Sequence, residues 1–330
     1  MRNRAPSTLI VLSGWATVRP TRKPARPLRL MADRALGLRD RPALRSAHRW
    51  MSRLKREVQV CVLSSGSAGN CTYVGDGHAG VLIDCGLSTK QIMTRLEEMG
   101  LGAAPIDAVL VTHEHGDHIA AAAVLWRALA ARGRPVPFYM TRGTAGGLPL
   151  HVQPDGIEFV RPGDTVAVSH LRAECFPIPH DTAEPIAWRV HLGEETVGVV
   201  TDLGCPTAIV AEKLSGCDLA VLEFNHDEEM LRTGSYPESL KQRIKGDRGH
   251  LSNSQAATLL GQGLSPRLKT LVLAHLSEAN NSPTKALESA LGVLHNRGVS
   301  DEIRVHIGRQ REALAPLRVG AFSGAKASRS

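Results

Sequence analysis

The sequence lacks a hydrophobic run long enough for a membrane span, and no two of its cysteines form a C-x-x-C pair. A transmembrane helix needs about 20 consecutive apolar residues, so we expect no membrane span. The cysteines lie singly among apolar or small residues, which favours buried thiols in a reducing cytoplasm over a disulfide framework or a cysteine zinc site. They are Cys61, Cys71, Cys85, Cys175, Cys205 and Cys217.

Acidic residues are scarce in residues 1–56, which contain 15 of the 40 Lys and Arg residues and only two acids, Asp33 and Asp40. The net charge of +8 therefore comes from this segment, and the rest of the chain is mildly acidic. The segment is also rich in proline and alanine and has no sustained hydrophobic period, which is typical of a non-globular leader. Overall charge thus says little about nucleic-acid binding by the core.

Three interpretations of the basic leader stay open. Residues 9–18 resemble a poor signal-peptide h-region, interrupted by Ser13 and Gly14, and an Arg-rich segment with few acids also resembles a transit peptide. We favour the third, an over-extended start, in which Met51 is the first residue of the native protein. Residues 320–330 are expected to form a disordered tail, which leaves residues 57–319 as the expected catalytic domain.

Short β-branched runs alternate with helical segments in this central part, which predicts one layered α/β domain. The sequence gives no indication of the oligomeric state. Strands are predicted at residues 58–63, 71–74, 80–84, 106–111, 136–140, 165–169, 172–177, 186–192, 195–201, 219–223, 270–274 and 302–306. Helices are predicted at residues 89–99, 119–132, 207–213, 252–264 and 283–295.

The motif THEHGDH at residues 112–118 carries the strongest chemical signal, because it follows a hydrophobic strand directly. Its potential ligands are His113, His115, Asp117 and His118. In an extended backbone the first two project to the same side, and imidazole and carboxylate groups suit zinc-like divalent ions. The number of these ligands and their crowding within six residues favour two ions about 3.5–4 Å apart over one tetrahedral ion. The alternative is a charged, solvated loop between a strand and a helix.

This H-x-H-x-D-H motif resembles the metallo-β-lactamase superfamily, over about residues 57–310. The resemblance implies an α/β fold, a four-layer αββα sandwich, with two divalent metal ions, zinc first and manganese as the alternative. It places one ion on His113, His115 and His180, the other on Asp117, His118 and His275, and Asp202 between them. Taken alone, His180 and His275 could be structural or surface residues, and Asp202 a turn residue.

Four further motifs resemble the YycJ/WalJ branch, which is related to RNase Z: SSGSAGN from residue 64, NHD from 225, GHLSN from 249 and HLSEANN from 275. The resemblance implies a metal-dependent hydrolase that cleaves phosphodiester bonds in nucleic acid, specifically a 5′-to-3′ DNA exonuclease. It implies that Asp117 orients the nucleophile and that His250, polarised by Glu223, protonates the leaving group. His226 is a further candidate for phosphate contact or proton transfer, with a helix-capping or surface role as the alternative.

Candidate substrate contacts come from three segments. The Gly-rich loop can offer N–H groups and side-chain donors to a phosphate, or it is an ordinary tight turn. The basic segment before GHLSN can hold a nucleic-acid backbone, or it is a solvated helix face. The candidates are Ser65, Ser67, Asn70, Lys241, Arg243, Asn253 and Ser277. Two other functions stay open: hydrolysis of a small ester, thioester or cyclic phosphodiester, and non-catalytic binding.

Overall fold

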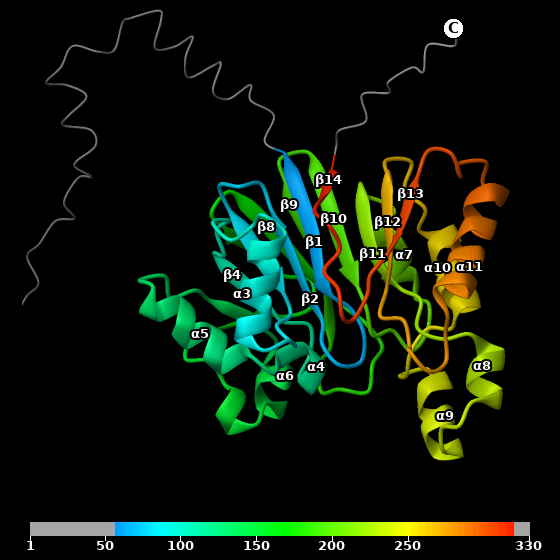
Figure 1. Cartoon of the computed structure of the whole chain (residues 1–330), viewed down its shortest axis with the longest axis horizontal. Helices are drawn as coiled ribbons and strands as arrows, with labels where there is room; N and C mark the ends of the chain where they lie inside the picture. Colours follow the sequence, from blue (N-terminus) through cyan, green and yellow to red (C-terminus); the bar gives the residue numbers. More distant parts are fainter. Residues whose placement is uncertain (1–56, 320–330) are drawn as a thin grey trace, which may run out of the picture. The chain divides into compact units, whose positions relative to one another are not determined.

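The fold consists of two mixed seven-stranded sheets packed face to face, with helices over both outer faces (Figure 1). A computed structural model describes residues 57–319, and the predictions for residues 1–56 and 320–330 lie outside the described residues. The four layers confirm the predicted αββα sandwich. In the described part of the chain, no helix is long and apolar enough to cross a membrane.

The first sheet begins with an antiparallel meander of three strands and continues with parallel strands. Across the sheet, the order is β14 (Leu317–Val319), β1 (Val58–Ser64), β2 (Cys71–Gly75), β3 (Gly80–Ile83), β4 (Ala108–Leu110), β5 (Phe138–Met140) and β6 (Ile157–Phe159). The antiparallel strand β14 closes the edge next to β1.

The second sheet pairs a parallel half with an antiparallel half. Its order is β13 (Arg304–Ile307), β12 (Thr270–Ala274), β11 (Leu219–Glu223), β10 (Glu195–Val200), β9 (Ile186–Leu192), β8 (Leu171–Pro177) and β7 (Thr165–Val168). Because β10, β11, β12 and β13 run parallel, their carboxyl ends meet at one rim of the sandwich.

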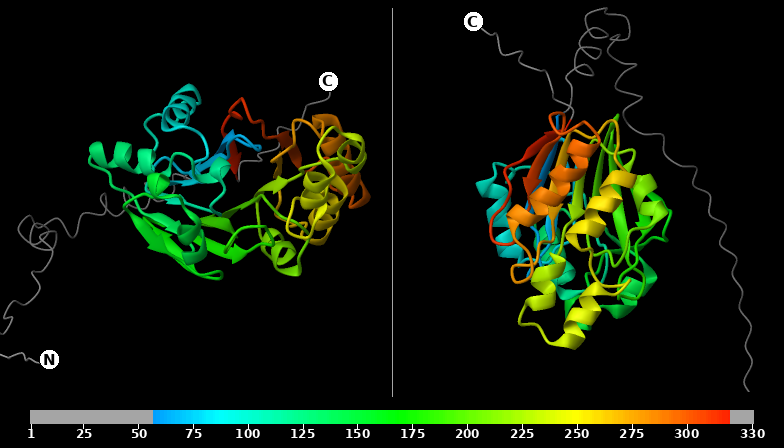
Figure 2. Two further views of the ribbon diagram at one scale, coloured as in Figure 1. Left: turned by 90° about the horizontal axis from the view of Figure 1, so that it is seen from below. Right: turned by 90° about the vertical axis from the view of Figure 1, so that its right-hand side faces the viewer.

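Helices cover the outer face of each sheet, as the different views in Figure 2 show. The helices that connect strands of the first sheet are α3 (Thr89–Glu98), α4 (Gly116–Ile119), α5 (Ala122–Ala131), α6 (Arg142–Gly147) and a short 3-10 turn, Leu150–Val152. The second sheet carries α7 (Ala208–Leu214), α10 (Asn253–Gln262) and α11 (Pro283–Asn296). Two short helices, α8 (Glu228–Thr233) and α9 (Glu238–Lys245), project beyond the sheets at the bottom of Figure 1.

Three apolar clusters hold these layers together. One lies between the sheets and contains the fully buried Trp188. A second packs Ile92 of α3 and Leu125 of α5 against the first sheet, and a third packs α7, α10 and α11 against the second sheet. Removing this apolar surface from water stabilises the sandwich by about 25 cal/mol per Å².

The predicted helix at residues 119–132 corresponds to α5, but its predicted start is wrong. A separate short helix, α4, ends at Ile119, and α5 begins at Ala122. The Ala121 N–H donates to the Cys85 carbonyl (3.0 Å) and the Cys85 N–H donates to the His118 carbonyl (2.7 Å). These bonds hold the chain against the end of β3 and bend it between α4 and α5. None of the ranges predicted from the sequence corresponds to α6, α8, α9, β6 or β14.

The cysteine prediction is confirmed in part. All six thiols are free, and five are buried, whereas Cys205 is only half-buried. Burial raises the pKa of Cys61 to about 12 and the pKa of Cys175 to about 11. These thiols therefore stay protonated and act as small apolar side chains.

Trp188 links the core to the strand that carries the histidine motif, because its indole N–H donates to the Val111 carbonyl (3.1 Å). We predict that Trp188→Phe lowers the free energy of unfolding by about 2 kcal/mol, since it leaves a buried carbonyl without its donor and a cavity beside it. Urea denaturation measures this loss. The control Val124→Ala, at a side chain that is 51% exposed, should change stability by less than about 0.5 kcal/mol. Equal stability of the two variants would contradict the prediction.

Candidate metal centre

Asp84, at the end of β3, organises the loop that contains the histidine motif. Its carboxylate accepts a hydrogen bond from the Thr112 N–H (2.8 Å) and one from the His118 Nδ1 (2.8 Å). The Thr112 hydroxyl in turn contacts the His113 Nδ1 at 2.9 Å. Asp84 is 3% exposed, so these bonds form away from bulk water. One buried carboxylate thus sets the orientation of the loop that follows β4.

One group of potential ligands consists of His113, His115 and His180. The His115 Nδ1 lies 3.1 Å from the His113 Nε2 and 3.2 Å from the His180 Nε2. Two of the rings belong to the loop after β4, whereas His180 follows β8 on the other sheet. Three imidazole nitrogens converging at this spacing form one face of a tetrahedral metal site.

A second group consists of Asp117, His118 and His275. The Asp117 Oδ2 lies 3.4 Å from the His118 Nε2 and 3.7 Å from the His275 Nε2. Asp202 stands between the two groups, because its Oδ2 lies 3.2 Å from the His118 Nε2 and its Oδ1 lies 3.9 Å from the His180 Nε2. Side chains from residues 113 to 275 therefore converge at one rim, with a carboxylate between two potential metal sites.

The ring nitrogens that face away from the centre are held by oxygen acceptors. The Nδ1 of His118 donates to Asp84 (2.8 Å), that of His180 to the Gly249 carbonyl (3.1 Å) and that of His275 to Glu223 (3.0 Å). Each bond uses Nδ1, so Nε2 is the ring nitrogen that faces the centre. Metal-binding histidines are oriented in this way by partners behind the ligand.

The surroundings shift the pKa values of the clustered histidines in different directions. Burial opposes a charge on His275, yet the carboxylates of Asp202, Asp117 and Glu223 raise its pKa to about 10. Burial would raise the pKa of Asp202, but the neighbouring imidazoles of His275 and His118 hold it well below its ordinary value. Burial also lowers the pKa of His113 and of His180, which keeps these rings neutral and able to bind a cation.

The residues present fit two divalent metal ions. Among the described residues, the buried Asp202 Oδ2 and His275 Nε2 have no hydrogen-bond partner. Both atoms point into the cluster, and a polar atom buried without a partner costs free energy unless something else satisfies it. Imidazole nitrogens and carboxylate oxygens are ligands for divalent ions of the zinc type. The donor set and the unsatisfied atoms therefore indicate a metal centre.

Glu223, the last residue of β11, connects the centre to His250. The Glu223 side chain is fully buried, and its Oε1 accepts from the Nδ1 of both His250 (2.9 Å) and His275 (3.0 Å). Its Oε2 accepts from the Leu203 N–H (2.7 Å). Burial would raise the pKa of Glu223, but the His250 ring is the main group that lowers it to about 2. This carboxylate therefore stays ionised and holds the His250 ring through its Nδ1.

A cavity of about 380 Å³ opens over these groups. Its wall contains His115, Asp117, Asp202, His250 and His275. The cavity is a pocket in the size range of known ligand sites, roughly 300–1,000 Å³. Of the predicted substrate contacts, the structure places three at this cavity: Ser67, Arg243 and Ser277.

Two further predicted substrate contacts, Ser65 and Asn70, lie behind the metal centre. The Ser65 hydroxyl accepts from the His275 N–H (2.7 Å), and the Asn70 amide lies 3.2 Å from Asp117 and 3.0 Å from the His118 Nε2. Both side chains are buried. They position metal ligands and do not line the cavity.

The other predicted contacts are engaged elsewhere. Asn253 exchanges hydrogen bonds with Asn281 (2.9 and 3.0 Å), and the Lys241 ammonium donates to the Arg232 carbonyl (2.9 Å). His226 is buried, which lowers its pKa to about 4, and it is absent from the described wall of the cavity. These three residues therefore take no part in the mechanism proposed below.

Several residues that line the cavity have no role predicted from the sequence, among them Asp181, Asn225 and Tyr236. Asn225 donates to the His275 carbonyl (2.9 Å), and its place in the NHD motif was the signal that could have identified it. Asp181 directly follows His180 and pairs with Arg243 (2.5 Å), a contact between residues 62 positions apart. No local pattern in the sequence reveals such a pair.

Comparisons with known proteins agree with this geometry. A family model described as a beta-lactamase superfamily domain matches residues 80–275. The chain is 34% identical over 254 residues to the exodeoxyribonuclease YycJ of Bacillus anthracis, covering 76% of this chain and 94% of that protein. It is also 34% identical over 225 residues to the exodeoxyribonuclease WalJ of Streptococcus pneumoniae serotype 2 (strain D39 / NCTC 7466), covering 67% and 82% of the two chains.

A solved structure gives an independent match to the fold. The metallo-beta-lactamase fold protein YhfI from Bacillus subtilis superposes with a TM-score of 0.59 at 17% identity, over 78% of this chain and 99% of that chain. The match therefore covers the sandwich and extends far beyond the histidine motif.

We predict that purified protein contains two divalent ions per chain and that Asp202→Asn or His180→Ala lowers this number to one or fewer. Each change removes a donor that faces the cluster. Elemental analysis by mass spectrometry measures the stoichiometry, and thermal unfolding should show a lower melting temperature because bound metal stabilises the folded state. The control His170→Gln removes a histidine that pairs with Asp76 outside the cluster and should leave both ions bound. Two ions retained in both cluster variants would contradict this assignment.

Proposed function

Because this chain belongs to the beta-lactamase superfamily, in the family of the YycJ and WalJ exodeoxyribonucleases, we propose that residues 57–319 form a metal-dependent phosphodiesterase acting on nucleic acid. The specific activity proposed is 5′-to-3′ exonucleolytic cleavage of DNA. The observation that carries the proposal is that one cavity is lined by members of both groups of potential metal ligands and by His250, which Glu223 holds from behind.

Two ions fit the seven converging side chains. His113, His115 and His180 would hold one ion, Asp117, His118 and His275 the other, and Asp202 would lie between them. We propose zinc, with manganese as the alternative, because imidazole-rich sites suit both and metal supply decides between them. When bound, such a pair acts as a Lewis acid that lowers the pKa of water and polarises a phosphoryl oxygen.

The chain's own residues would then bring the reacting groups together. Asp117 lies at the cavity wall beside His118 and His275, where its carboxylate can orient the attacking water. Ser67 and Ser277 lie at the same wall and offer hydroxyl donors to phosphate oxygens. Holding both reactants in line turns a bimolecular step into an effectively unimolecular one.

His250 is the proposed general acid. Its Nδ1 donates to the buried Glu223, which leaves Nε2 as the ring nitrogen available to the cavity. With Nδ1 held by this carboxylate, an Nε2–H of His250 can protonate the departing alkoxide. Glu223 also holds His275, so one carboxylate sets the positions of a metal ligand and the general acid together.

Activity on a panel of substrates tests the proposed function. Purified protein is incubated with 5′-labelled duplex DNA, single-stranded DNA, RNA and bis(4-nitrophenyl) phosphate, with and without a chelator. We expect chelator-sensitive release of nucleotides from the 5′ end of DNA. Hydrolysis of small esters alone, with every nucleic acid left intact, would contradict the proposed function.

We predict that His250→Ala lowers kcat on DNA by about 10²- to 10⁴-fold, the usual contribution of a general acid. It should leave the metal content unchanged, because the alanine removes no proposed ligand. Steady-state kinetics and elemental analysis measure the two quantities. His226→Gln is the matched control, since it changes a neighbouring buried histidine outside the cavity wall and should retain most of the activity. Loss of metal in His250→Ala would overturn the assigned role.

A further inference from the structure

One part of the cavity wall has no role in the proposed mechanism. This part of the wall contains Leu240 and Ile244 of α9 and Tyr236, which lies two residues before the helix. Leu240 and Ile244 are four residues apart and therefore lie on the same side of α9. All three are half-buried, so part of each remains accessible. The cavity therefore combines a charged side, suited to phosphate, with an apolar side.

Three contacts fix this apolar wall relative to the general acid. The His250 N–H donates to the Ile244 carbonyl (2.9 Å), and the Lys241 ammonium ties α9 to α8 through the Arg232 carbonyl (2.9 Å). A Cβ at Gly249 would come within 2.2 Å of the Ile244 carbonyl oxygen, so only glycine allows this close approach. The wall is thus held in place before any ligand enters.

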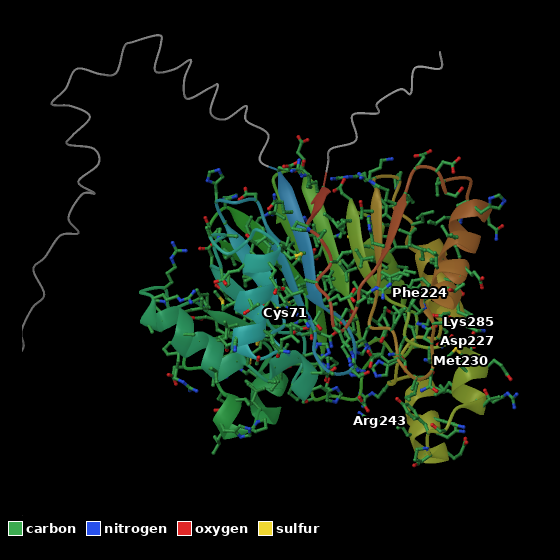
Figure 3. All side chains as sticks on the ribbon, viewed as in Figure 1. Cys71, Phe224, Asp227, Met230, Arg243 and Lys285 are labelled. Carbon is green, nitrogen blue, oxygen red and sulfur yellow. The ribbon has the colours of Figure 1, made fainter. Side chains whose placement is uncertain are left out.

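The ion pair between Arg243 and Asp181 (2.5 Å) joins α9 to the loop that holds His180. Arg243 extends from α9 toward the middle of the molecule in Figure 3. Both residues line the cavity, so the pair joins the apolar wall to the ligand side. A group seated against the wall therefore lies between α9 and the metal centre.

We propose that Tyr236, Leu240 and Ile244 bind a nucleobase next to the scissile phosphate, with the Tyr236 ring stacked on the face of the base. This proposal rests on the proposed nuclease function and names the part of the substrate that the apolar wall recognises. Every nucleobase has a π-face, so an aromatic ring beside aliphatic side chains binds bases with little dependence on sequence. The base must leave its own stack to reach the wall, which favours single-stranded or frayed ends.

The test combines a protein change with a substrate change. Wild-type protein and Tyr236→Ala are assayed on short single strands that carry all bases, or that lack the base of the first or second nucleotide at the attacked end. We expect removal of the base at one of these positions to lower kcat/KM of the wild type about tenfold, mostly through KM, which is within the range for one stacked base. Tyr236→Ala should show the same loss on the intact strand and no further loss on the abasic one.

Tyr236→Phe is the conservative variant and should keep the wild-type preference for the intact strand, because phenylalanine also stacks. Fluorescence anisotropy of the same strands in the His250→Ala background gives a second readout that does not require turnover. Melting temperature and metal content of Tyr236→Ala should match the wild type.

The outcomes separate this proposal from the function on which it rests. If Tyr236→Ala loses activity equally on intact and abasic strands, or on neither, the wall does not bind a base. If the wild type cleaves intact and abasic strands equally fast, the base proposal is wrong and the nuclease assignment stands. If the wild type cleaves no nucleic acid, the function and the base proposal both fail.

Discussion

The parallel register of β10, β11 and β12 is the constraint on which the site depends. Val200 pairs with Leu222, and Glu223 pairs with Ala274, so these strands end at nearly the same level. The residues that follow or end them are Asp202, Glu223 and His275. A buried carboxylate is costly unless donors surround it, and Glu223 is surrounded by two ring nitrogens and two backbone N–H groups. The register of the sheet thus places Asp202 and Glu223 at the same rim. Hydrogen bonds to the carboxylates lower the free-energy cost of burying them.

Several residues at the strand ends of this rim have a backbone conformation that residues other than glycine rarely adopt. In the described chain, four residues other than glycine have a positive φ, and three of them are Asp84 (61°), Asp202 (64°) and His275 (54°). This conformation costs non-glycine residues of order 1–3 kcal/mol each, although Asp and His adopt it more readily than most. The surrounding hydrogen bonds, such as that from the His275 N–H to Ser65, hold the strained residues in place. In this conformation Asp202 and His275 face the centre, whereas Asp84 holds the His118 ring from behind.

The sequence could predict the strands because buried strands have a clear pattern. Residues 186–192, 219–223 and 270–274 are β-branched or apolar runs, and the structure gives the same limits for all three. The αββα sandwich came from the resemblance. Helices α8 and α9 had no such signal, because they are short, polar and bury few residues. The roles of Ser65, Asn70 and Lys241 could not be predicted either, since a serine, amide or ammonium group can face a substrate or a neighbouring carbonyl. Only the fold decides which partner lies within reach.

Charge balance at the metal centre explains how a chain that is mildly acidic beyond residue 56 can bind a polyanion. Four carboxylates lie at the centre or directly behind its histidines, those of Asp84, Asp117, Asp202 and Glu223, and three of them are almost fully buried. Without cations this rim would repel a phosphate. Two divalent ions would carry the same amount of positive charge, so a loaded centre would be close to neutral. Arg243 at the cavity wall is itself balanced by its ion pair with Asp181. Attraction for a phosphate would therefore arise locally, from the ions held at the metal centre.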